Sequence, residues 1–433
     1  MLLREIDGKN VCLLGFGKEG KASLAALHAH TPAAHITIAD RNPGVSQDPD
    51  AAGCTVQAGD TWLDDLERFD VLVKSPGIPP QAALAAVATK TTTATRIFFA
   101  EANARDATII GVTGTKGKST TSSLLAAMLR DAKRDARLVG NIGRPALLDL
   151  ESADKNTIFV HELSSYQLCD LDCSPHAAVV TSFFPEHLDY HGSVEAYLDA
   201  KCHITRSQGP DDMVFFCAAS PGAVRIAQEG EGRKIPFTPE DAPVRLEETQ
   251  LIGQHNLSNI AGAFLAAQAF GATEASARKT ILAFQGLPHR LQAVGRFAGI
   301  DWVDDAISTT PESAVAALQA LGDRVDTIIL GGQDRGVDFT ILADELTARS
   351  VVRTAILFPG TGPRIRDAIT QAGRRDIVMI DVTSMDDAVR IAAERTKAGG
   401  ICLLSTASPS YNMFKNFEEK GDVFQRCVRA LGA

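Results

Sequence analysis

Short apolar runs alternate with stretches of helical spacing along most of the chain. The first run covers residues 10–15, ends in glycine, and is followed by a helical stretch over residues 18–28. A second apolar run covers residues 35–40, and a third covers residues 70–74 before a Ser-Pro-Gly turn. Strand, helix and strand in succession form the βαβ pattern, which predicts a parallel sheet.

The same alternation returns in the middle of the chain. Strands are predicted over residues 107–113, 157–160 and 177–181, and helices over residues 119–132 and 259–270. The pattern therefore predicts a second α/β unit, in which a strand feeds a glycine-rich loop and then a helix.

A third unit follows residues 286–290. Its predicted strands cover residues 326–330, 355–358 and 400–404, and the first of them ends in two glycines. We therefore predict an α/β protein with three domains. They are a Rossmann-like domain over residues 1–97, a central P-loop ATPase domain over residues 98–286 and a Rossmann-like domain over residues 287–433.

Composition agrees with this organisation. A chain of 433 residues suggests about three domains at roughly 150 residues each. A net charge of -10 argues against a nucleic-acid partner, which usually needs a basic face. No apolar run reaches the roughly 18 residues of a membrane span, and the first residues lack a signal-peptide layout. We therefore expect a cytoplasmic protein, and a monomer.

A phosphate-binding loop is predicted where the strand over residues 107–113 ends. Backbone N–H groups of such a loop, together with the helix N-terminus behind it, attract phosphate. Lys118 would reach the terminal phosphates of ATP, and Ser119 would hold Mg²⁺. The spacing departs from the strict P-loop pattern, because Val112 occupies the place of the first glycine. The predicted ATP-binding residues of this loop are Gly114, Thr115, Lys116, Gly117, Lys118, Ser119 and Thr120.

A second glycine motif, G-x-G-x-x-G over residues 15–20, follows the first predicted strand and opens a helix. Asp40 ends the next predicted strand, as in dinucleotide-binding folds. The spacing alone leaves NAD, another diphosphate-bearing nucleotide, and glycines that serve only tight packing as alternatives. A diphosphate on the helix N-terminus, with Asp40 near a ribose or base, is the safer prediction.

Several further motifs follow one another along the chain. They are GTKGKST over residues 114–120, GNIG over 140–143, ELSSYQL over 162–168, EHLD over 186–189, AK over 200–201, GQHNLSN over 253–259 and GLPHR over 286–290. In these motifs the chain resembles the Mur ligases. Two more motifs, over residues 74–78 and 414–418, resemble the glutamate-adding members in particular.

The resemblance implies an ATP-dependent ligase that joins glutamate to UDP-N-acetylmuramoyl-L-alanine in peptidoglycan precursor synthesis. The γ-phosphoryl group of ATP would activate the alanyl carboxylate as an acyl phosphate. The amine would then attack through a tetrahedral intermediate, and ADP and phosphate would leave. Cations are needed at such a site because two anions must approach each other.

The resemblance also implies roles for particular residues. Lys118, Glu162, His187 and Lys201 would be catalytic. Two Mg²⁺ ions are expected, held by Ser119, Glu162, His187 and a Lys201 that has reacted with CO₂ to form a carbamate. Further ATP contacts are expected at Asn259, Arg290 and Asp305. The UDP-substrate would be bound by Gly17, Lys18, Glu19, Asp40, Arg41, Gly77, Asn141, Ser164 and Gln167.

The third domain departs from the family pattern. Ile307 stands where the glutamate-adding members carry a lysine, and the run over residues 405–411 is altered. The expected glutamate-binding residues are Thr309, Arg335, Ser410 and Phe417. The departures resemble a subgroup that uses L-glutamate, so both enantiomers stay open.

Two other functions are compatible with parts of the sequence. One is another Mur or folylpolyglutamate-type ligase, against which the motifs over residues 74–78 and 414–418 argue. The other is a nucleotide-sensing regulator with a Rossmann domain and an ATPase switch, which has no need of Glu162, His187 and Lys201 together. Dependence of ATP hydrolysis on both the UDP-sugar and an amino acid would separate the ligase from the regulator.

Overall fold

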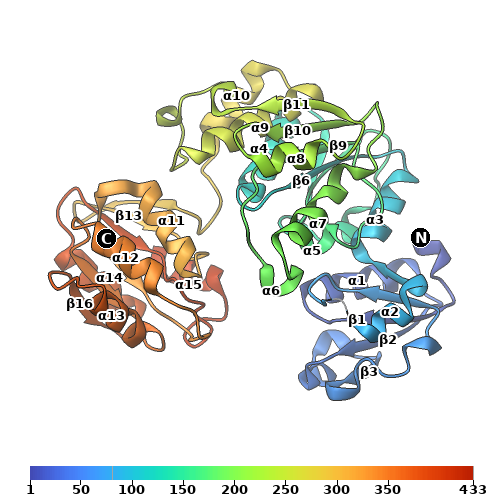
Figure 1. Ribbon diagram of the computed structural model, residues 1–433, viewed down its shortest axis with the longest axis horizontal. Helices are drawn as coiled ribbons and strands as arrows, with labels where there is room; N and C mark the ends of the chain where they lie inside the picture. Colours follow the sequence, from blue (N-terminus) through green and yellow to red (C-terminus); the bar gives the residue numbers. More distant parts are fainter. Residues whose placement is uncertain (80, 433) are drawn as a thin grey trace. The chain divides into compact units, whose positions relative to one another are not determined.

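The chain folds into two compact units that together contain three sheets (Figure 1). The structure, a computed structural model, describes residues 1–79 and 81–432. Unit 1 comprises Met1–Arg245 and His255–Leu282, and unit 2 comprises Leu246–Gln254 and Ala283–Ala433. The predicted α/β class with three sheets is confirmed.

The first sheet of unit 1 has five parallel strands in the order β3-β2-β1-β4-β5. Its central strand β1 is buried from its second residue to its last, whereas the edge strand β3 is partly exposed. The strands are β1 (Asn10–Leu14), β2 (His35–Asp40), β3 (Thr55–Ala58), β4 (Val71–Lys74) and β5 (Thr91–Thr93).

The second sheet of unit 1 has six parallel strands in the order β11-β10-β9-β6-β8-β7. Three neighbouring strands, β9, β6 and β8, are almost entirely buried, as expected when helices cover both faces of a parallel sheet. The strands are β6 (Thr108–Thr113), β7 (Asp135–Gly140), β8 (Thr157–Glu162), β9 (Ala177–Val180), β10 (Met213–Cys217) and β11 (Arg233–Phe237).

The helices of unit 1 follow the strands as the βαβ pattern predicts. The predicted boundaries of α1 and α4 agree with the structure within about two residues. The helices are α1 (Lys18–His30), α2 (Ala82–Ala86), α3 (Ala94–Asn103), α4 (Lys118–Asp131), α5 (Ser165–Leu168), α6 (Leu188–His191), α7 (Val194–Arg206), α8 (Pro221–Ala227), α9 (His255–Ala269) and α10 (Glu274–Ala283).

Unit 2 contains the third sheet, in the order β12-β13-β17-β14-β15-β16. All neighbouring strands are parallel except β12 and β13, which form an antiparallel hairpin that the sequence pattern did not predict. The strands are β12 (Gln292–Phe297), β13 (Ile300–Asp304), β14 (Val325–Leu330), β15 (Thr354–Leu357), β16 (Val378–Asp381) and β17 (Ile401–Leu404).

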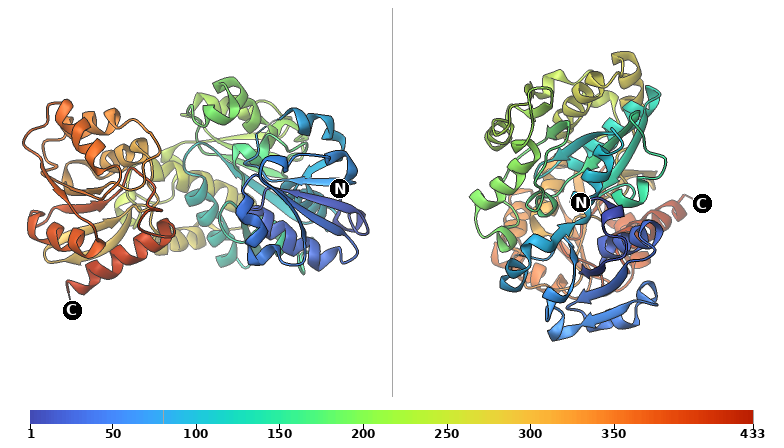
Figure 2. Two further views of the ribbon diagram at one scale, coloured as in Figure 1. Left: turned by 90° about the horizontal axis from the view of Figure 1, so that it is seen from below. Right: turned by 90° about the vertical axis from the view of Figure 1, so that its right-hand side faces the viewer.

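Helices cover both faces of this third sheet (Figure 2). One apolar cluster joins the sheet to α11 (Pro311–Leu321), α12 (Thr340–Ala348) and α13 (Gly362–Gln371). A second cluster joins its other face to α14 (Met385–Arg395) and α15 (Phe417–Ala430). The loops after β14 and β17 therefore lead to opposite faces of the sheet. Such diverging loops at the carboxyl ends of strands commonly form ligand sites.

The predicted domain boundaries at 97 and 286 stay predictions. The first falls inside α3, and the second lies just beyond α10. Contact density separates unit 2 near the second boundary but keeps the first two sheets in one unit.

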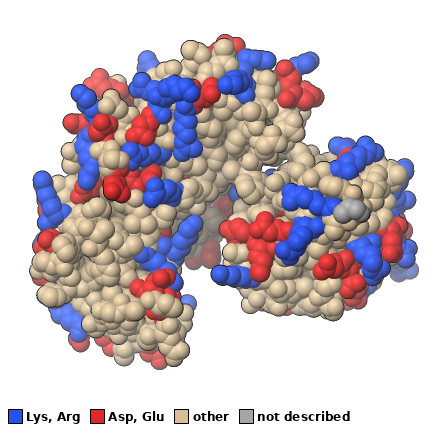
Figure 3. Space-filling model, turned by 180° about the vertical axis from the view of Figure 1, so that it is seen from behind, with Lys and Arg blue, Asp and Glu red and all other residues tan. Residues whose placement is uncertain are grey.

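Charges of both signs are interspersed on the face that Figure 3 shows, over both units. Within residues 1–79 and 81–432, no helix has the length and apolar character needed to cross a membrane.

The buried histidine of β8 gives unit 1 a pH dependence that can be tested. His161 packs its ring 5.0 Å from the ring of Phe98, and burial lowers its pKa from 6.5 to about 3. The unfolded chain therefore binds a proton that the folded chain excludes. Its contribution to stability is present above pH 6.5 and is lost as the pH falls toward 3.

We expect the free energy of unfolding to decline more steeply with falling pH in the wild type than in His161→Leu. The difference between their slopes should reach at most about 1.4 kcal/mol per pH unit between pH 6.5 and 3. Chemical denaturation across this range measures it. His30→Ala, at an exposed histidine, should keep the wild-type slope. Equal slopes for the wild type and His161→Leu would contradict the assignment.

Candidate active site

The predicted phosphate loop lies where β6 ends and α4 begins. Its backbone is tied to the segment after β9, because Thr115 N–H donates to the Ser182 carbonyl at 2.9 Å. Lys116 N–H donates to the Ser182 hydroxyl at 3.0 Å. Gly117 takes a left-handed conformation with φ of 89° and precedes the first residue of α4. The loop is thus held in shape with the N-terminus of α4 behind it, the arrangement that binds phosphate.

Both glycines of the loop are packed against other elements. A Cβ on Gly114 would lie 2.0 Å from Thr181 Oγ1, and a Cβ on Gly117 would lie 2.2 Å from Asn259 Oδ1. Asn259 lies on α9, which packs against α4. The structure therefore brings the predicted ATP contact Asn259 to the loop, although the two are far apart in the sequence.

Two lysines converge on one carbonyl of the loop. Lys118 Nζ donates to the Gly114 carbonyl at 2.8 Å and to the Thr115 carbonyl at 3.0 Å. Lys201 Nζ, from α7, donates to the same Gly114 carbonyl at 3.1 Å. Lys201 is buried, and burial together with the charge of Lys118 lowers its pKa well below 10.5. Lys201 is therefore a weaker base than an ordinary lysine.

Other side chains around the loop hold the two lysines in place. The hydroxyl of Tyr197, one turn before Lys201 on α7, lies 3.1 Å from Thr115 Oγ1. Lys201 Nζ lies 4.8 Å from the Tyr197 ring centre. Lys116 Nζ pairs with Glu186 Oε1 at 2.5 Å. The loop is consequently connected to the segment that carries His187.

Two oxygen-bearing side chains lie at the ends of neighbouring strands. Glu162 is the last residue of β8 and is 3% exposed. In the register of the two neighbouring strands it lies opposite Val112 of β6. Ser119 is buried in the first turn of α4. Mg²⁺ is commonly held by one or two such protein oxygens together with substrate phosphates and waters. Within residues 1–79 and 81–432, no group of three or more His, Cys, Asp or Glu is spaced to hold a metal. The metal ligands predicted at Ser119 and Glu162 therefore stay a prediction.

His187 takes a left-handed backbone conformation, with φ of 57°, just before α6. Such strain in a residue with a side chain is uncommon and gathers at functional sites. Its ring lies 5.1 Å from that of Tyr166 and 5.9 Å from that of Tyr197. Burial lowers its pKa below 6.5; the charge of Glu186 opposes this, and the charges of Lys118 and Lys201 add to it. The imidazole is therefore neutral near pH 7, able to ligate a metal or accept a proton.

The first glycine loop is built as its motif predicts. A Cβ on Gly20 would lie 2.1 Å from the Gly15 carbonyl, so α1 approaches β1 closely only because residue 20 is glycine. Asp40 accepts hydrogen bonds from Phe16 N–H at 2.6 Å and from Asn42 N–H at 2.7 Å. Its carboxylate thus shapes the loop, a structural role that the sequence spacing did not reveal. Its predicted contact with a ribose or base stays a prediction.

A hydrogen-bond chain joins this loop to the end of β8. Gln167 Nε2 donates to Glu19 Oε1 at 2.7 Å, and Gln167 Oε1 accepts from Ser164 N–H at 2.9 Å. Burial raises the pKa of Glu19, and the bond from Gln167 counteracts part of that rise. Glu19 Oε2 is buried and has no hydrogen-bond partner among the described residues. Three predicted UDP-substrate residues therefore meet in one place.

The other predicted UDP-substrate residues lie on loops. Gly17, Lys18, Arg41, Gly77 and Asn141 are all exposed. Lys74, which precedes the turn that contains Gly77, pairs with Asp170 at 2.7 Å. The structure positions these loops without testing their predicted contacts.

In unit 2, two predicted nucleotide contacts lie close together. Asp305 is 2% exposed; its Oδ2 accepts from Ser405 Oγ at 2.9 Å and its Oδ1 from Leu291 N–H at 3.2 Å. Burial raises its pKa to about 6, and hydrogen bonds and the charge of Arg290 oppose the rise. Arg290 Nε is buried without a hydrogen-bond partner among the described residues.

The predicted glutamate-binding residues occupy loops at the carboxyl ends of the third sheet and the start of α15. Ser410 is buried, Arg335 lies over the Tyr411 ring, and Phe417 packs against the ring of His289. Thr309 is partly buried after β13. Sequence reasoning missed Lys420, which is fully buried and donates to Ser410 Oγ at 2.9 Å. The available signal was a lysine three residues after Phe417 and four before Phe424, the spacing of one helix face.

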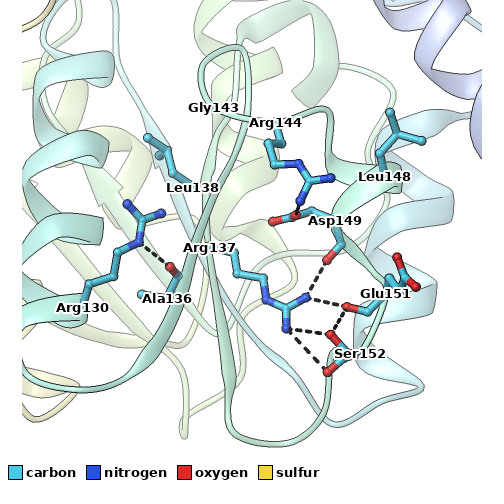
Figure 4. Close-up of a pocket in the computed structure, with 10 residues that line it drawn as sticks. All are labelled: Arg130, Ala136, Arg137, Leu138, Gly143, Arg144, Leu148, Asp149, Glu151 and Ser152. Atoms are coloured by element: carbon cyan, nitrogen blue, oxygen red, sulfur yellow. Dashed lines mark hydrogen bonds and ion pairs between the residues drawn. The ribbon is translucent and has the colours of Figure 1, made fainter.

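A pocket of about 630 Å³ lies beside β7 (Figure 4). Arg137 donates to the carbonyls of Asp149 and Glu151, and Arg144 pairs with the Asp149 carboxylate at 2.6 Å. None of the predicted site residues lines this pocket. Arg137 and Arg144 therefore stabilise the segment after β7 through these hydrogen bonds and this ion pair.

The fold and this site define an ATP-binding α/β protein in which a phosphate loop lies beside a buried lysine and a strained histidine. The chain matches the model of the Mur ligase middle domain over residues 112–241 and that of the Mur ligase glutamate ligase domain over residues 289–408. It belongs to the Mur ligase family and is an ATP-dependent amide ligase of that family, whose members use ATP and Mg²⁺.

Similar proteins cover the chain almost completely. A UDP-N-acetylmuramoyl-L-alanine–L-glutamate ligase of Salinispora tropica is 37% identical, and the match covers 99% of both chains. One of Micromonospora sp. is 36% identical, over 99% of this chain and 98% of the relative. A UDP-N-acetylmuramoylalanine–D-glutamate ligase of Streptococcus mutans is 31% identical, over 99% of both chains.

Solved structures support the same fold. The UDP-N-acetylmuramate-alanine ligase of Thermotoga maritima aligns with a TM-score of 0.62 at 16% identity, covering 98% of this chain and 99% of the other. The MurF ligase of Thermotoga maritima aligns with a TM-score of 0.59 at 15% identity, covering 99% and 97%.

The packing of Gly117 against α9 can be tested by one substitution. In Gly117→Ala the new Cβ would meet Asn259 Oδ1, so the loop must shift. We expect ATP affinity, measured by calorimetry, to fall at least about tenfold, because small displacements of a positioned site are costly. Gly53→Ala is the matched control, since Gly53 has a similar φ of 85° and nothing within 4 Å of the added Cβ. Unchanged ATP affinity in Gly117→Ala would show that the loop tolerates the shift.

Proposed function

We propose that this protein ligates glutamate to UDP-N-acetylmuramoyl-L-alanine with ATP, in peptidoglycan precursor synthesis. The observation that carries the proposal is the pair of lysines on the Gly114 carbonyl, one charged and on the phosphate loop, the other buried and poorly basic. The names of the relatives that match over nearly the whole chain support the choice of substrates.

The first step makes the alanyl carboxylate reactive. Its oxygen attacks the γ-phosphorus of ATP, the bond to the β-γ bridging oxygen breaks, and an acyl phosphate and ADP form. The loop's N–H groups and the helix N-terminus bind the phosphates, and Lys118 places positive charge where negative charge gathers. The other ATP contacts of this proposal are Asn259, Arg290 and Asp305.

The Ser119 hydroxyl and the Glu162 carboxylate fit Mg²⁺, because both are oxygen ligands at the carboxyl edge of the sheet. A bound Mg²⁺ would neutralise phosphate charge during transfer. Glu162 would hold the first ion, and His187 together with Lys201 would hold a second.

Lys201 fits a metal only after chemical change. A neutral amine nitrogen attacks the carbon of CO₂, an N–C bond forms, and a proton leaves to solvent. The product is a carbamate anion with two oxygens. The depressed pKa of Lys201 favours this reaction, because a protonated lysine is not a nucleophile.

In the second step the amine of glutamate attacks the acyl carbon. The tetrahedral intermediate collapses, the C–O bond to phosphate breaks, and an amide and inorganic phosphate remain. The neutral imidazole of His187 can orient the amine or accept its proton. Thr309, Arg335, Ser410 and Phe417 hold the amino acid in this proposal.

The first glycine loop binds the UDP portion of the substrate. The loop is closed tightly by Gly20, yet a Cβ on Gly17 would meet nothing within 4 Å. No contact with residues 1–79 or 81–432 therefore requires glycine at residue 17, whereas a diphosphate close to the N-terminus of α1 would. Glu19, Ser164 and Gln167 face the same region through their shared hydrogen bonds.

L-Glutamate is the proposed enantiomer. Two relatives named for L-glutamate, of Salinispora tropica and Micromonospora sp., are 36–37% identical over 99% of this chain, against 31% for the relative of Streptococcus mutans named for D-glutamate. The uncharged Ile307 lies after β13, and its N–H donates to the His289 carbonyl at 3.1 Å. A site without a lysine at residue 307 must hold the amino-acid carboxylates in a different way.

Kinetic assays with each enantiomer test this choice. We expect kcat/KM for L-glutamate to exceed that for D-glutamate by at least about 100-fold, because the wrong enantiomer leaves buried polar groups unpaired. ATP hydrolysis should need both the UDP-substrate and glutamate. Strict use of D-glutamate would overturn the enantiomer, and ATP hydrolysis indifferent to both substrates would overturn the ligase.

Removal of CO₂ tests the role of Lys201. Enzyme prepared in CO₂-free buffer should lose most of its activity and regain it on addition of bicarbonate. Intact-protein mass spectrometry under mild conditions should show the added mass of one CO₂ in wild type and not in Lys201→Arg, whose guanidinium stays protonated. Lys279→Arg, at an exposed lysine, is the matched control. Full activity without CO₂ would refute carbamylation.

A further inference from the structure

Lys420 is an unusual lysine for its place in the fold. It lies in α15 near the helix N-terminus and is 0% exposed. A cation at this position is destabilised both by the loss of hydration and by the positive end of the helix dipole. A flexible lysine normally avoids both costs by reaching solvent. Helix stability therefore does not explain this residue.

The ammonium group of Lys420 has hydroxyl partners and no carboxylate partner. Its Nζ donates to Thr406 Oγ1 at 2.6 Å and to Ser410 Oγ at 2.9 Å. Within residues 1–79 and 81–432 it forms no ion pair. The ammonium group of Lys420 is thus hydrogen-bonded to two hydroxyl groups on the loop after β17, and no carboxylate among the described residues pairs with it.

The Thr406 and Ser410 hydroxyls differ in whether each has an acceptor for its own proton. Thr406 Oγ1 donates to the Ser408 carbonyl at 2.9 Å, so its proton is used inside the protein. Ser410 Oγ accepts from Lys420 and has no acceptor for its own proton among the described residues. A hydroxyl that accepts from an ammonium is a polarised donor toward a further acceptor.

The surroundings of Lys420 hold it in this orientation. Its neighbour Gly421 brings α15 against His289, since a Cβ there would lie 2.0 Å from His289 Nδ1. His289 Nδ1 lies 2.8 Å from Asp304 Oδ2, and Gln425 Nε2 donates to the same oxygen at 2.8 Å. The Asp304 carboxylate is thereby occupied by other groups.

We propose that Lys420 is the positioning residue of the amino-acid subsite: through Ser410 it directs a polarised hydroxyl proton, and the positive charge behind it, at a carboxylate of the incoming glutamate. This rests on the proposed function, in which Ser410 contacts glutamate. It also accounts for Ile307, because the cation missing from the loop after β13 is supplied from α15.

Titration of Lys420 makes the proposal measurable. Burial lowers its pKa to about 7, and the charges of Asp304 and Asp305 oppose that shift. The charged groups that face it are those two carboxylates from β13 and its end, with His289 already paired to Asp304. Below about pH 7 the ammonium is present; above it the amine is neutral and the subsite loses its charge.

Steady-state kinetics of the full chain test this with three variants. In Lys420→Met we expect KM for glutamate to rise about 10- to 100-fold, as for loss of a hydrogen bond backed by charge. KM for ATP and for the UDP-substrate should change less than about twofold. Lys420→Arg should restore most of the glutamate affinity, and Lys397→Met, at an exposed lysine of unit 2, should behave as wild type. Unchanged KM for glutamate in Lys420→Met would overturn the proposal.

The pH profile provides a readout that a purely structural lysine would not move. KM for glutamate should rise above about pH 7 in wild type but stay low in Lys420→Arg, because arginine keeps its charge. Titration of glutamate itself is common to both proteins. Parallel profiles would overturn the proposal even if Lys420→Met fails to fold. In addition, Lys420→Met should add little to the effect of Ser410→Ala, and additive effects would show that Lys420 does not act through Ser410.

The two proposals fail in different ways. If wild type does not ligate glutamate, the proposed function is wrong. If wild type ligates glutamate but Lys420→Met keeps the wild-type KM, only the role of Lys420 is wrong.

Discussion

The Gly114 carbonyl, which accepts hydrogen bonds from both Lys118 and Lys201, is the contact on which the central site depends. Burial on α7 lowers the pKa of Lys201 most, and the charge of Lys118 adds to that shift. One loop conformation thus places a lysine of the phosphate loop beside a poorly basic amine. That conformation requires glycine at residues 114 and 117, because the loop packs directly against Thr181 and Asn259.

A single side chain, that of Gln167, also connects the two sheets of unit 1. Gln167 uses its amide oxygen to cap α5 through Ser164 and its amide nitrogen to hold Glu19 in the first glycine loop. β8 ends with Glu162 just before this cap. A shift of the first glycine loop would therefore displace Gln167 and with it the segment after β8, next to the proposed metal ligand Glu162. One side chain thus connects the first glycine loop to the segment that follows β8.

The sequence predicted the buried strands of each sheet and missed the strands at the sheet edges. β6, β8 and β9 are continuous apolar runs because both faces are covered, whereas the edge strands β3 and β12 carry exposed polar residues and read as loops. β10 and β13 were also missed, although both lie inside their sheets. The phosphate loop was predictable from local spacing. The bonding of Asp40 to Phe16, and of Lys420 to Ser410, depends on tertiary packing that no spacing encodes.

Unit 2 shows how a buried polar network can be stable and still serve binding. Asp304 is bonded by His289 and Gln425, and Asp305 by Ser405 and the Leu291 N–H, so both carboxylates are satisfied and cost little to bury. Lys420 is the exception, since its charge passes only to hydroxyl groups. An unneutralised buried cation is costly without ligand, and an anionic ligand removes that cost on binding. The pattern therefore favours a carboxylate-bearing substrate at the loop after β17, and it places the origin of that preference in α15 rather than in the residues that would touch the substrate.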